Sequence, residues 1–315
     1  FFRGHEMTAG EWERTQSHLY PVLDHYQQEG YQALMKIANQ YGGAFLCDGV
    51  GLGKTLVGLM LIERLIMYDR KRVALVVPKA ARKPVWEKHI ERYVPYIGAV
   101  HYFSNLSIFN HTDLLRGNEF PQRFERIAEM ADVIVIDEAH HFRNPGIREQ
   151  TRYWKLYDIC KGKTVFFLTA TPVNNSLRDL QHMIEIVSQR RADYFKAAPL
   201  GIHSLPGHFR KLEKNMEKLL IKKQADEDVM PEVNQAEAER ILFNDSLFRA
   251  LVVQRSRGYV RRSQEQHGGS KAIFPKREPP QVVKYNLRKT YGRLLDMVEK
   301  AFAKEKPLFS LAMYY

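Results

Sequence analysis

The chain has 315 residues, of which 44% are hydrophobic and 27% charged, and its formal net charge is +12. This composition is ordinary for a soluble globular protein, and no apolar run approaches the ~20 residues of a transmembrane helix, which excludes a membrane-spanning chain. The length exceeds one ordinary core and predicts two domains or one domain with a large insertion. The basic excess favours a polyanionic partner, with a merely solvated basic surface as the alternative.

The first 19 residues mix charged and aromatic side chains without a clear period, and we expect an N-terminal extension there. No secretory leader is visible in residues 1–16, and because residue 1 is phenylalanine, we expect a piece of a longer polypeptide. The two cysteines, Cys47 and Cys160, are too few for a disulfide framework. These features predict a reduced intracellular location: the cytoplasm, the nucleoid or the nucleus.

A glycine-rich loop connects an apolar run at residues 44–47 to an apolar, helix-forming run at residues 56–62. Its glycines let the backbone wrap an anion without Cβ clashes, and the start of the helix attracts negative charge. Lys54 then neutralises the β- and γ-phosphates of a nucleotide, and the Thr55 hydroxyl binds Mg²⁺. The predicted nucleotide contacts in this loop are Gly49, Gly51, Gly53, Lys54 and Thr55. The alternative is a chance glycine turn before a core helix, since Asp48 stands where the general pattern has a glycine.

A second apolar run at residues 72–78 predicts a buried strand, and residues 79–93 predict a helix. Strand, helix and strand with short connections are typical of a parallel α/β sheet. A further strand is expected at residues 99–103. The predicted helix begins with three cations, namely Lys79, Arg82 and Lys83. They either contact phosphates or are simply solvated.

An apolar run at residues 133–136 ends on two acids, Asp137 and Glu138. Its β-branched residues predict a strand buried on both faces, as in parallel sheets. An acid at that strand end can hold the water shell of Mg²⁺, and its neighbour can accept a proton from an attacking water. We therefore assign Asp137 to the metal and Glu138 to the general base. Residues 165–168 predict another apolar strand, which ends at two threonines.

Two adjacent histidines, His140 and His141, follow the acids. Neighbouring residues on a regular element do not readily chelate one ion together, and no cysteine or third histidine has metal-site spacing around them. We expect no metal site built on this pair.

Four segments of the chain, in their order along the sequence, resemble the first motor lobe of superfamily-two helicases, and within them the SWI/SNF-type DNA translocases. The segments are residues 26–30 (YQQEG), 48–55 (DGVGLGKT), 137–140 (DEAH) and 168–175 (LTATPVNN). The group tends to have an aspartate at the position of Asp48. The resemblance implies a RecA-like parallel sheet with helices on both faces, ATP and Mg²⁺ as cofactors, and ATP hydrolysis that drives movement along nucleic acid, usually double-stranded DNA.

The same resemblance implies roles for further residues. Gln27 presents its amide to the adenine edge, with an ordinary surface glutamine as the alternative. His140 links the acidic pair to the segment that holds Thr169 and Thr171. The cations that begin the helix at residue 79 contact the nucleic-acid backbone.

The part of the chain after residue 175 carries most of the basic excess, with 26 basic and 17 acidic side chains. Residues 211–223 predict an amphipathic helix that projects from the lobe and is a candidate surface for protein partners. Residues 255–289 hold ten cations and two acids. Arg261 and Arg262 resemble an arginine pair that precedes the family's second lobe, and we expect them either to contact DNA or to form ion pairs that hold the lobes in register.

The predicted parts are an N-terminal extension (1–19), a first RecA-like lobe (20–190), a helical insertion and linker (191–270) and the start of a second RecA-like lobe (271–315). We expect a flexible joint at residues 266–270, a strand at 281–286 and a helix at 290–302. In the family, arginines of the second lobe reach the γ-phosphate, and such a residue is worth ~10³ to 10⁵ in rate. No stretch after Leu308 can hold them, so we expect this chain alone to bind ATP poorly or hydrolyse it slowly.

These features together predict an ATP-dependent translocase that moves along duplex DNA. The alternatives are a strand-separating DNA helicase of the same superfamily and a non-motor ATP-binding module that switches a protein interface. Lys54, Asp137 and Glu138 favour the motor, because a module that only binds nucleotide has no use for a general base.

Overall fold

The computed structural model describes residues 10–98, 105–115, 122, 125, 129–148, 151–173, 176–224, 235–268, 292–294 and 296–297. The chain divides into two compact units, Phe1–Ala272 and Ile273–Tyr315, and the elements below belong to the first. In the second unit, residues 292–294 and 296–297 are helical, within the helix predicted at residues 290–302. The strand predicted at residues 281–286 lies outside the described residues.

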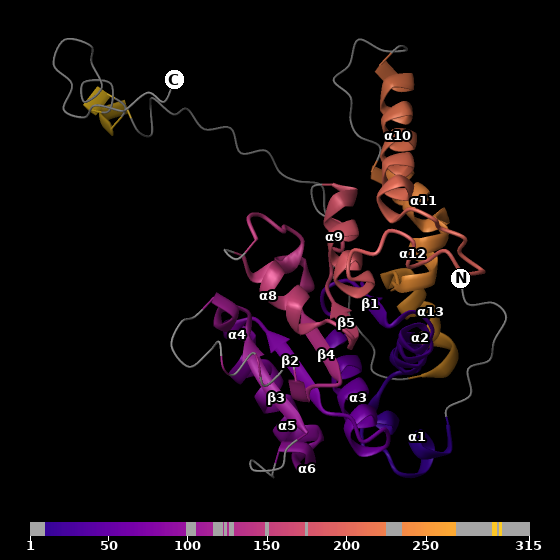
Figure 1. The fold of residues 1–315 in the computed structure, drawn as a ribbon. Helices are drawn as coiled ribbons and strands as arrows, with labels where there is room; N and C mark the ends of the chain where they lie inside the picture. Colours follow the sequence, from indigo (N-terminus) through magenta and orange to yellow (C-terminus); the bar gives the residue numbers. More distant parts are fainter. Residues whose placement is uncertain are drawn as a thin grey trace. The chain divides into compact units, whose positions relative to one another are not determined.

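Parallel strands form one six-stranded sheet in the order β3-β2-β4-β5-β1-β6 (Figure 1). The strands are β1 (Gly43–Leu46), β2 (Val73–Val77), β3 (Leu106–Asn110), β4 (Val133–Asp137), β5 (Thr164–Leu168) and β6 (Val252–Val253). All residues of β1, β2 and β4 are buried, as expected for strands covered on both faces. The strand expected at residues 99–103 lies outside the described residues, and β3 begins at Leu106.

Helices cover both faces of the sheet, so the predicted parallel α/β architecture is confirmed. On one face the rings of Phe45 and Phe167 stack with centroids 4.4 Å apart, whereas Ala44 and Leu46 pack on the other face. The first face is covered by α8 (Arg152–Ile159), α9 (Leu177–Ser188), α10 (Leu205–Gln224) and α12 (Ser246–Leu251). The second is covered by α2 (His25–Tyr41), α3 (Lys54–Met67) and α5 (Lys88–Tyr93).

The two helices beside β1 have identifiable sequence causes. A capping box begins α2, in which the Gln27 side chain accepts a hydrogen bond from the Asp24 backbone N–H at 3.0 Å. The same helix ends at Gly42, whose φ of 75° is a left-handed cap that glycine adopts without a Cβ penalty. The apolar run in α3 is buried nearly all round, as its sequence predicts.

The helix predicted at residues 79–93 is present but not uniform. After α4 (Lys79–Ala81) the chain makes a π-helical turn, η2 (Arg82–Glu87), and continues as α5. Pro84 lies inside the turn and favours such an interruption, because proline has no N–H and crowds the preceding turn. The turn places Trp86 in the interior, with 0% of its surface exposed.

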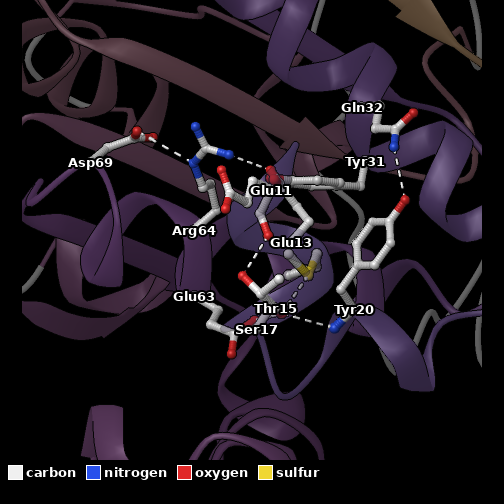
Figure 2. A network of polar contacts seen from close by, with 11 residues as sticks. Glu11, Glu13, Thr15, Ser17, Tyr20, Tyr31, Gln32, Glu63, Arg64 and Asp69 are labelled. Carbon is white, nitrogen blue, oxygen red and sulfur yellow. Dashed lines mark hydrogen bonds and ion pairs between the residues drawn. The ribbon is translucent and has the colours of Figure 1, made fainter. Parts of the chain in front are cut away.

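Residues 10–23 pack against α2 and α3 through a buried polar network (Figure 2). The network contains Glu13, Ser17, Tyr20, Tyr31, Gln32, Glu63, Arg64 and Asp69. In α1 (Glu11–Thr15), the Glu13 carboxylate pairs with Arg64 and accepts a hydrogen bond from the Tyr31 hydroxyl at 2.7 Å. Buried charges are stable only when they are paired in this way. Residues 10–19, predicted as an extension without a known role, therefore pack as part of the compact unit.

The segment that follows α10 returns to the sheet. Part of α10 extends away from the body of the protein, and α11 (Gln235–Asn244) leads back to α12 (Figure 1). Strand β6 then pairs with β1 at the edge of the sheet, and α13 (Arg257–His267) follows. The joint predicted at residues 266–270 is wrong at its start, because Gln266 and His267 belong to α13, and residues 269–270 lie outside the described residues.

Short elements complete the described part of the unit: α6 (Pro95–Gly98), η1 (Tyr20–Val22), η3 (His111–Leu115) and η4 (Ala139–Phe142). Among the described helices, none is both long enough and apolar enough to cross a lipid bilayer.

Candidate functional site

The glycine-rich loop follows β1 and leads directly into α3. Gly51 (φ 84°) and Gly53 (φ 77°) adopt left-handed conformations that other residues reach only with strain, whereas Gly49 does not. Gly53 is also the N-cap of α3, and a side chain there would collide with the Gln27 amide. A Cβ added at Gly51 would meet nothing within 4 Å. The loop thus combines two conformations that require glycine with open space beside one of them.

Lys54 and Thr55 are the first two residues of α3. The Lys54 ammonium donates to the carbonyl oxygens of Asp48 at 3.0 Å and Gly49 at 3.2 Å, so the loop folds around the charge. Thr55 is half-buried in the first turn, where the helix dipole favours an anion. Both side chains lie at the helix start, as the sequence predicts.

Asp48, the departure from the general phosphate-loop pattern, has a partner 207 residues away. Its carboxylate, 0% exposed, accepts hydrogen bonds from the backbone N–H of Arg255 at 2.9 Å and from its Nε at 3.0 Å, and it also contacts Nη2. The guanidinium lies 5.3 Å from the centre of the Tyr26 ring, and a side chain at Gly30 would collide with it. Arg255 is therefore buried and neutralised, which corrects its place among the cations of the predicted basic stretch.

Gln27 is buried against the phosphate loop, so the surface-glutamine alternative is wrong. Its Nε2 donates to the Leu52 carbonyl at 3.3 Å, and its Oε1 accepts from the Asp24 backbone N–H at 3.0 Å. The Tyr26 hydroxyl donates to the same Leu52 carbonyl at 3.2 Å. An adenine edge would compete with these contacts for the amide, and the adenine role stays a prediction.

Asp137 is the last residue of β4 and is 8% exposed. One carboxylate oxygen accepts a hydrogen bond from the Trp86 indole N–H at 2.7 Å, and the other accepts from the Glu138 backbone N–H at 3.0 Å. Burial raises the pKa of Asp137, whereas the Trp86 hydrogen bond and the charge of Lys54 oppose that rise. The positive charge of Lys54 in the loop therefore favours the ionised form of this acid.

Glu138 has a left-handed backbone with φ 47°, which costs a non-glycine residue about 1–2 kcal/mol. Such strain is concentrated at functional positions. Its carboxylate lies 3.1 Å from His140 Nδ1, and Thr169 Oγ1 lies 3.2 Å from the same nitrogen. Burial, with help from Arg143, lowers the pKa of His140.

Thr169 connects the three predicted segments. Its backbone N–H donates to the Leu46 carbonyl at the end of β1 at 3.0 Å, and its hydroxyl accepts from the Thr171 N–H at 3.3 Å. Because β5 lies between β4 and β1, the loop, the acids and the threonines meet at the carboxyl ends of these three strands. Ligands of open α/β sheets bind at the carboxyl ends of the strands. His140 and Thr171 also line a cavity of about 650 Å³ at these ends.

The predicted nucleic-acid contacts lie on two helical segments. Lys79 and Lys83 are exposed, whereas Arg82 is half-buried and pairs with a neighbouring carboxylate, that of Glu87, at 2.7 Å. The other two contacts are exposed on α13, namely Arg261 and Arg262. These five contacts stay predictions.

Sequence reasoning missed three buried residues of the site: Trp86, His111 and Arg255. His111 Nε2 lies 2.8 Å from the Asp137 carbonyl oxygen, and burial lowers the pKa of His111 to about 4. Nothing in the sequence places His111 beside the acids, whereas the aspartate in the phosphate loop signals that a cation is required nearby. Among the described residues, no group of three or more His, Cys, Asp or Glu side chains is arranged to hold a metal ion.

Comparison with known proteins identifies the family. Residues 26–238 match the family model described as SNF2-related domain, which is more than half of the chain. The chain belongs to the SNF2-related domain family. Its described sheet and its phosphate loop lie in or beside the matched range, so the family assignment and the site geometry concern the same part of the chain.

Several relatives of this SNF2-related chain are named as ATP-dependent helicases. It is 28% identical over 169 residues to the uncharacterized ATP-dependent helicase YqhH of Bacillus subtilis, covering 51% of this chain and 28% of that protein. It is 25% identical over 181 residues to the ATP-dependent helicase brm of Drosophila melanogaster, covering 53% and 11% respectively. The corresponding match to the DNA repair and recombination protein RAD54B of Gallus gallus is 26% over 192 residues, covering 52% and 20%. The chain thus spans less than a third of the length of these relatives.

Among solved structures, the chain is similar to the SWI2/SNF2 ATPase core of Sulfolobus solfataricus in complex with dsDNA. The sequences are 22% identical, the TM-score is 0.46, and the match covers 74% of this chain and 44% of that chain.

Proposed function

We propose that this chain carries the nucleotide-binding lobe of an ATP-driven translocase that moves along duplex DNA. The proposal depends on one observation: Lys54, Asp137 and Glu138 lie together at the carboxyl ends of neighbouring strands of the sheet. Membership of the SNF2-related family and the names of its relatives support ATP as the fuel. A DNA track also implies an intracellular location, in the nucleoid, the nucleus or the cytoplasm.

The loop has the features that a triphosphate requires. Two left-handed glycines shape the backbone, and there is open space beside Gly51. Within the part of the chain that the structure describes, the Lys54 ammonium donates its hydrogen bonds to loop carbonyls, which a phosphate oxygen replaces with a stronger, charge-assisted contact. Gln27 and Tyr26 fasten the loop from α2 through the Leu52 carbonyl. Within this proposal, Gln27 turns its amide to adenine when nucleotide binds.

Asp137 and Thr55 are the residues that would hold Mg²⁺. A hard oxygen donor set of one carboxylate and one hydroxyl, completed by phosphates and water, suits this ion better than an all-protein cage. Bound Mg²⁺ would neutralise charge on the β- and γ-phosphates. Asp137 is already held by two hydrogen bonds, so its carboxylate needs little reorganisation to serve.

Glu138 is the proposed general base. It is about one third exposed, it follows the buried Asp137 with a left-handed backbone, and its carboxylate lies 3.1 Å from His140 Nδ1. A base in this position accepts a proton from the water that attacks the γ-phosphate. His140 and Thr169 join this base to β5, and Thr171 extends the path to the rim of the cavity. We propose that this path couples hydrolysis to movement.

The proposed DNA contacts are cationic and exposed. Lys79 and Lys83 follow the carboxyl end of β2, next to the strand that carries the acids, and Arg82 accompanies them. Phosphate contacts of this kind hold a duplex without reading its sequence. Arg261 and Arg262 on α13 are the proposed second contact surface. The part of α10 that extends from the body is the proposed surface for protein partners (Figure 1).

The experiment is displacement of a third strand from a DNA triplex by the full-length protein with ATP and Mg²⁺. A duplex translocase displaces the third strand and leaves the underlying duplex intact. Separation of the duplex strands would instead identify a helicase. ATP binding without either activity would identify a nucleotide-switched module and overturn the proposal.

A further inference from the structure

Trp86 is a fully buried side chain that contacts the candidate metal ligand. It lies in the π-helical turn η2, and its indole N–H donates to the Asp137 carboxylate at 2.7 Å. Single π-helical turns inside helices occur frequently at functional sites. This turn connects the carboxyl end of β2 with α5, and the exposed Lys83 belongs to the same turn as Trp86.

A glycine in the phosphate-loop helix makes room for the same indole. A Cβ added at Gly58 of α3 would lie 2.8 Å from the Trp86 Cη2 atom and 2.8 Å from Leu168 Cδ1, which is closer than side chains tolerate. Glycine inside a helix costs about 1 kcal/mol relative to alanine, so its presence in the middle of α3 fits a packing requirement. Trp86 therefore fills the space between η2, α3 and β5.

The Asp137 carboxylate has little freedom while Trp86 is present. One oxygen is fixed by the indole and the other by the Glu138 backbone N–H. Because Asp137 is only 8% exposed, bulk water has little access to it in the folded protein. The orientation of Asp137 therefore depends on where η2 holds Trp86.

We propose that Trp86 is a positioning residue that sets the Asp137 carboxylate for Mg²⁺ and links it mechanically to the cations of α4 and η2. This inference rests on the proposed function, because it takes Asp137 as the metal ligand and the turn as the contact with DNA. A shift of η2 on binding a phosphate backbone moves the indole, and the indole moves the carboxylate. Partners that orient a metal ligand in this way typically contribute 10- to 100-fold in metal affinity or activity, as an order of magnitude.

The test compares Trp86→Phe with Trp154→Phe in the full-length protein. Phenylalanine keeps most of the buried ring but cannot donate a hydrogen bond. Trp154 is the matched control, because it is also buried and its indole nitrogen has no hydrogen-bond partner among the described residues. The first readout is ATP affinity, measured with a fluorescent ATP analogue during Mg²⁺ titration and again in EDTA. The second is the stimulation of ATP turnover by duplex DNA.

Mg²⁺ is expected to increase the affinity for ATP, and the inference predicts that Trp86→Phe needs about 10-fold more Mg²⁺ to reach half of that increase. The affinity for ATP in EDTA should be unchanged. It also predicts a reduced stimulation by DNA. Trp154→Phe should change neither quantity. Equal Mg²⁺ titrations for the two variants would overturn the inference even if the wild-type protein is strongly stimulated by DNA. A wild type without DNA stimulation would overturn the proposed function, while the Mg²⁺ titration would still decide the role of Trp86.

A second variant guards against a Trp86→Phe protein that does not fold. Gly58→Ala keeps every polar group and displaces the indole from the opposite side, since its Cβ would lie 2.8 Å from the ring. The same shift of the Mg²⁺ titration, smaller in size, is expected. A Gly58→Ala protein that folds and titrates like the wild type would contradict the proposal.

Discussion

Removing the Arg255 side chain tests whether the phosphate loop is held by a distant segment of the chain. In Arg255→Met an unbranched apolar side chain remains, and the guanidinium, which lies over the Tyr26 ring, is lost. Asp48, 0% exposed, then keeps its hydrogen bond from the backbone N–H of residue 255 and loses both side-chain contacts. The variant therefore leaves a buried carboxylate without a countercharge.

The structure indicates a large effect. Breaking a buried ion pair by removing one partner costs about 3–5 kcal/mol. Since domains are stable by about 5–15 kcal/mol, this is a substantial fraction of the total. The double variant Asp48→Asn, Arg255→Met removes both charges and keeps an oxygen to accept the backbone N–H. It should therefore cost less than the sum of the single variants, with a coupling of at least ~2 kcal/mol.

Urea unfolding followed by tryptophan fluorescence measures these differences. At unchanged slope, the midpoint of Arg255→Met should fall by about 1 M or more. Arg262→Met is the control, because this exposed arginine lies on α13 and its loss should change stability by no more than about 0.5 kcal/mol. ATP affinity should fall in Arg255→Met as well, because Asp48 belongs to the loop. The reasoning would be refuted if the free energy of unfolding of Arg255→Met lay within 1 kcal/mol of the wild type. It would also be refuted if the cost of the double variant equalled the sum of the costs of the two single variants.

Three further predictions follow from the site. Lys54→Ala should abolish nucleotide binding, whereas Glu138→Gln should bind ATP normally and lose turnover, because only the base is removed; equal losses of affinity in a binding titration would contradict these roles. Gly53→Ala should destabilise the protein in thermal unfolding more than Gly162→Ala does, because both glycines have positive φ but only Gly53 faces the Gln27 amide. In a binding titration, the logarithm of the DNA association constant should fall against log salt with a slope of about −0.9 per contacted phosphate, and a flat dependence would argue against a phosphate track.

Four strands of the sheet, β1, β2, β4 and β5, were predictable because of where they lie, whereas β3 was not predicted at residues 106–110. Runs such as residues 73–77 and 133–137 are buried on both faces, so continuous apolar, β-branched sequence marks them directly. The loop residues and the acids were predictable for a related reason, since each follows a strand whose end is visible in the sequence. Strand β6 was missed because two residues are too short to show a period, and it exists through its pairing with β1.

Partnerships across the chain were not predictable. The polar partner of a buried side chain depends on which elements the fold brings together, and a local pattern carries no such information. Arg255 looked like one of many cations in a basic stretch, and only the fold places it on Asp48. Trp86 looked like a core residue of a helix, which it is, but its hydrogen bond to Asp137 depends on the neighbouring strands β2 and β4.

The rate of ATP turnover by the full-length protein, titrated with duplex DNA, tests the central claim most directly. We predict a rate that rises with DNA and saturates in the wild type, and that stays near zero at all DNA concentrations in Glu138→Gln. The two proteins should bind ATP with the same affinity. A wild-type rate that does not respond to duplex DNA, or a Glu138→Gln protein that hydrolyses ATP as fast as the wild type, would contradict the account.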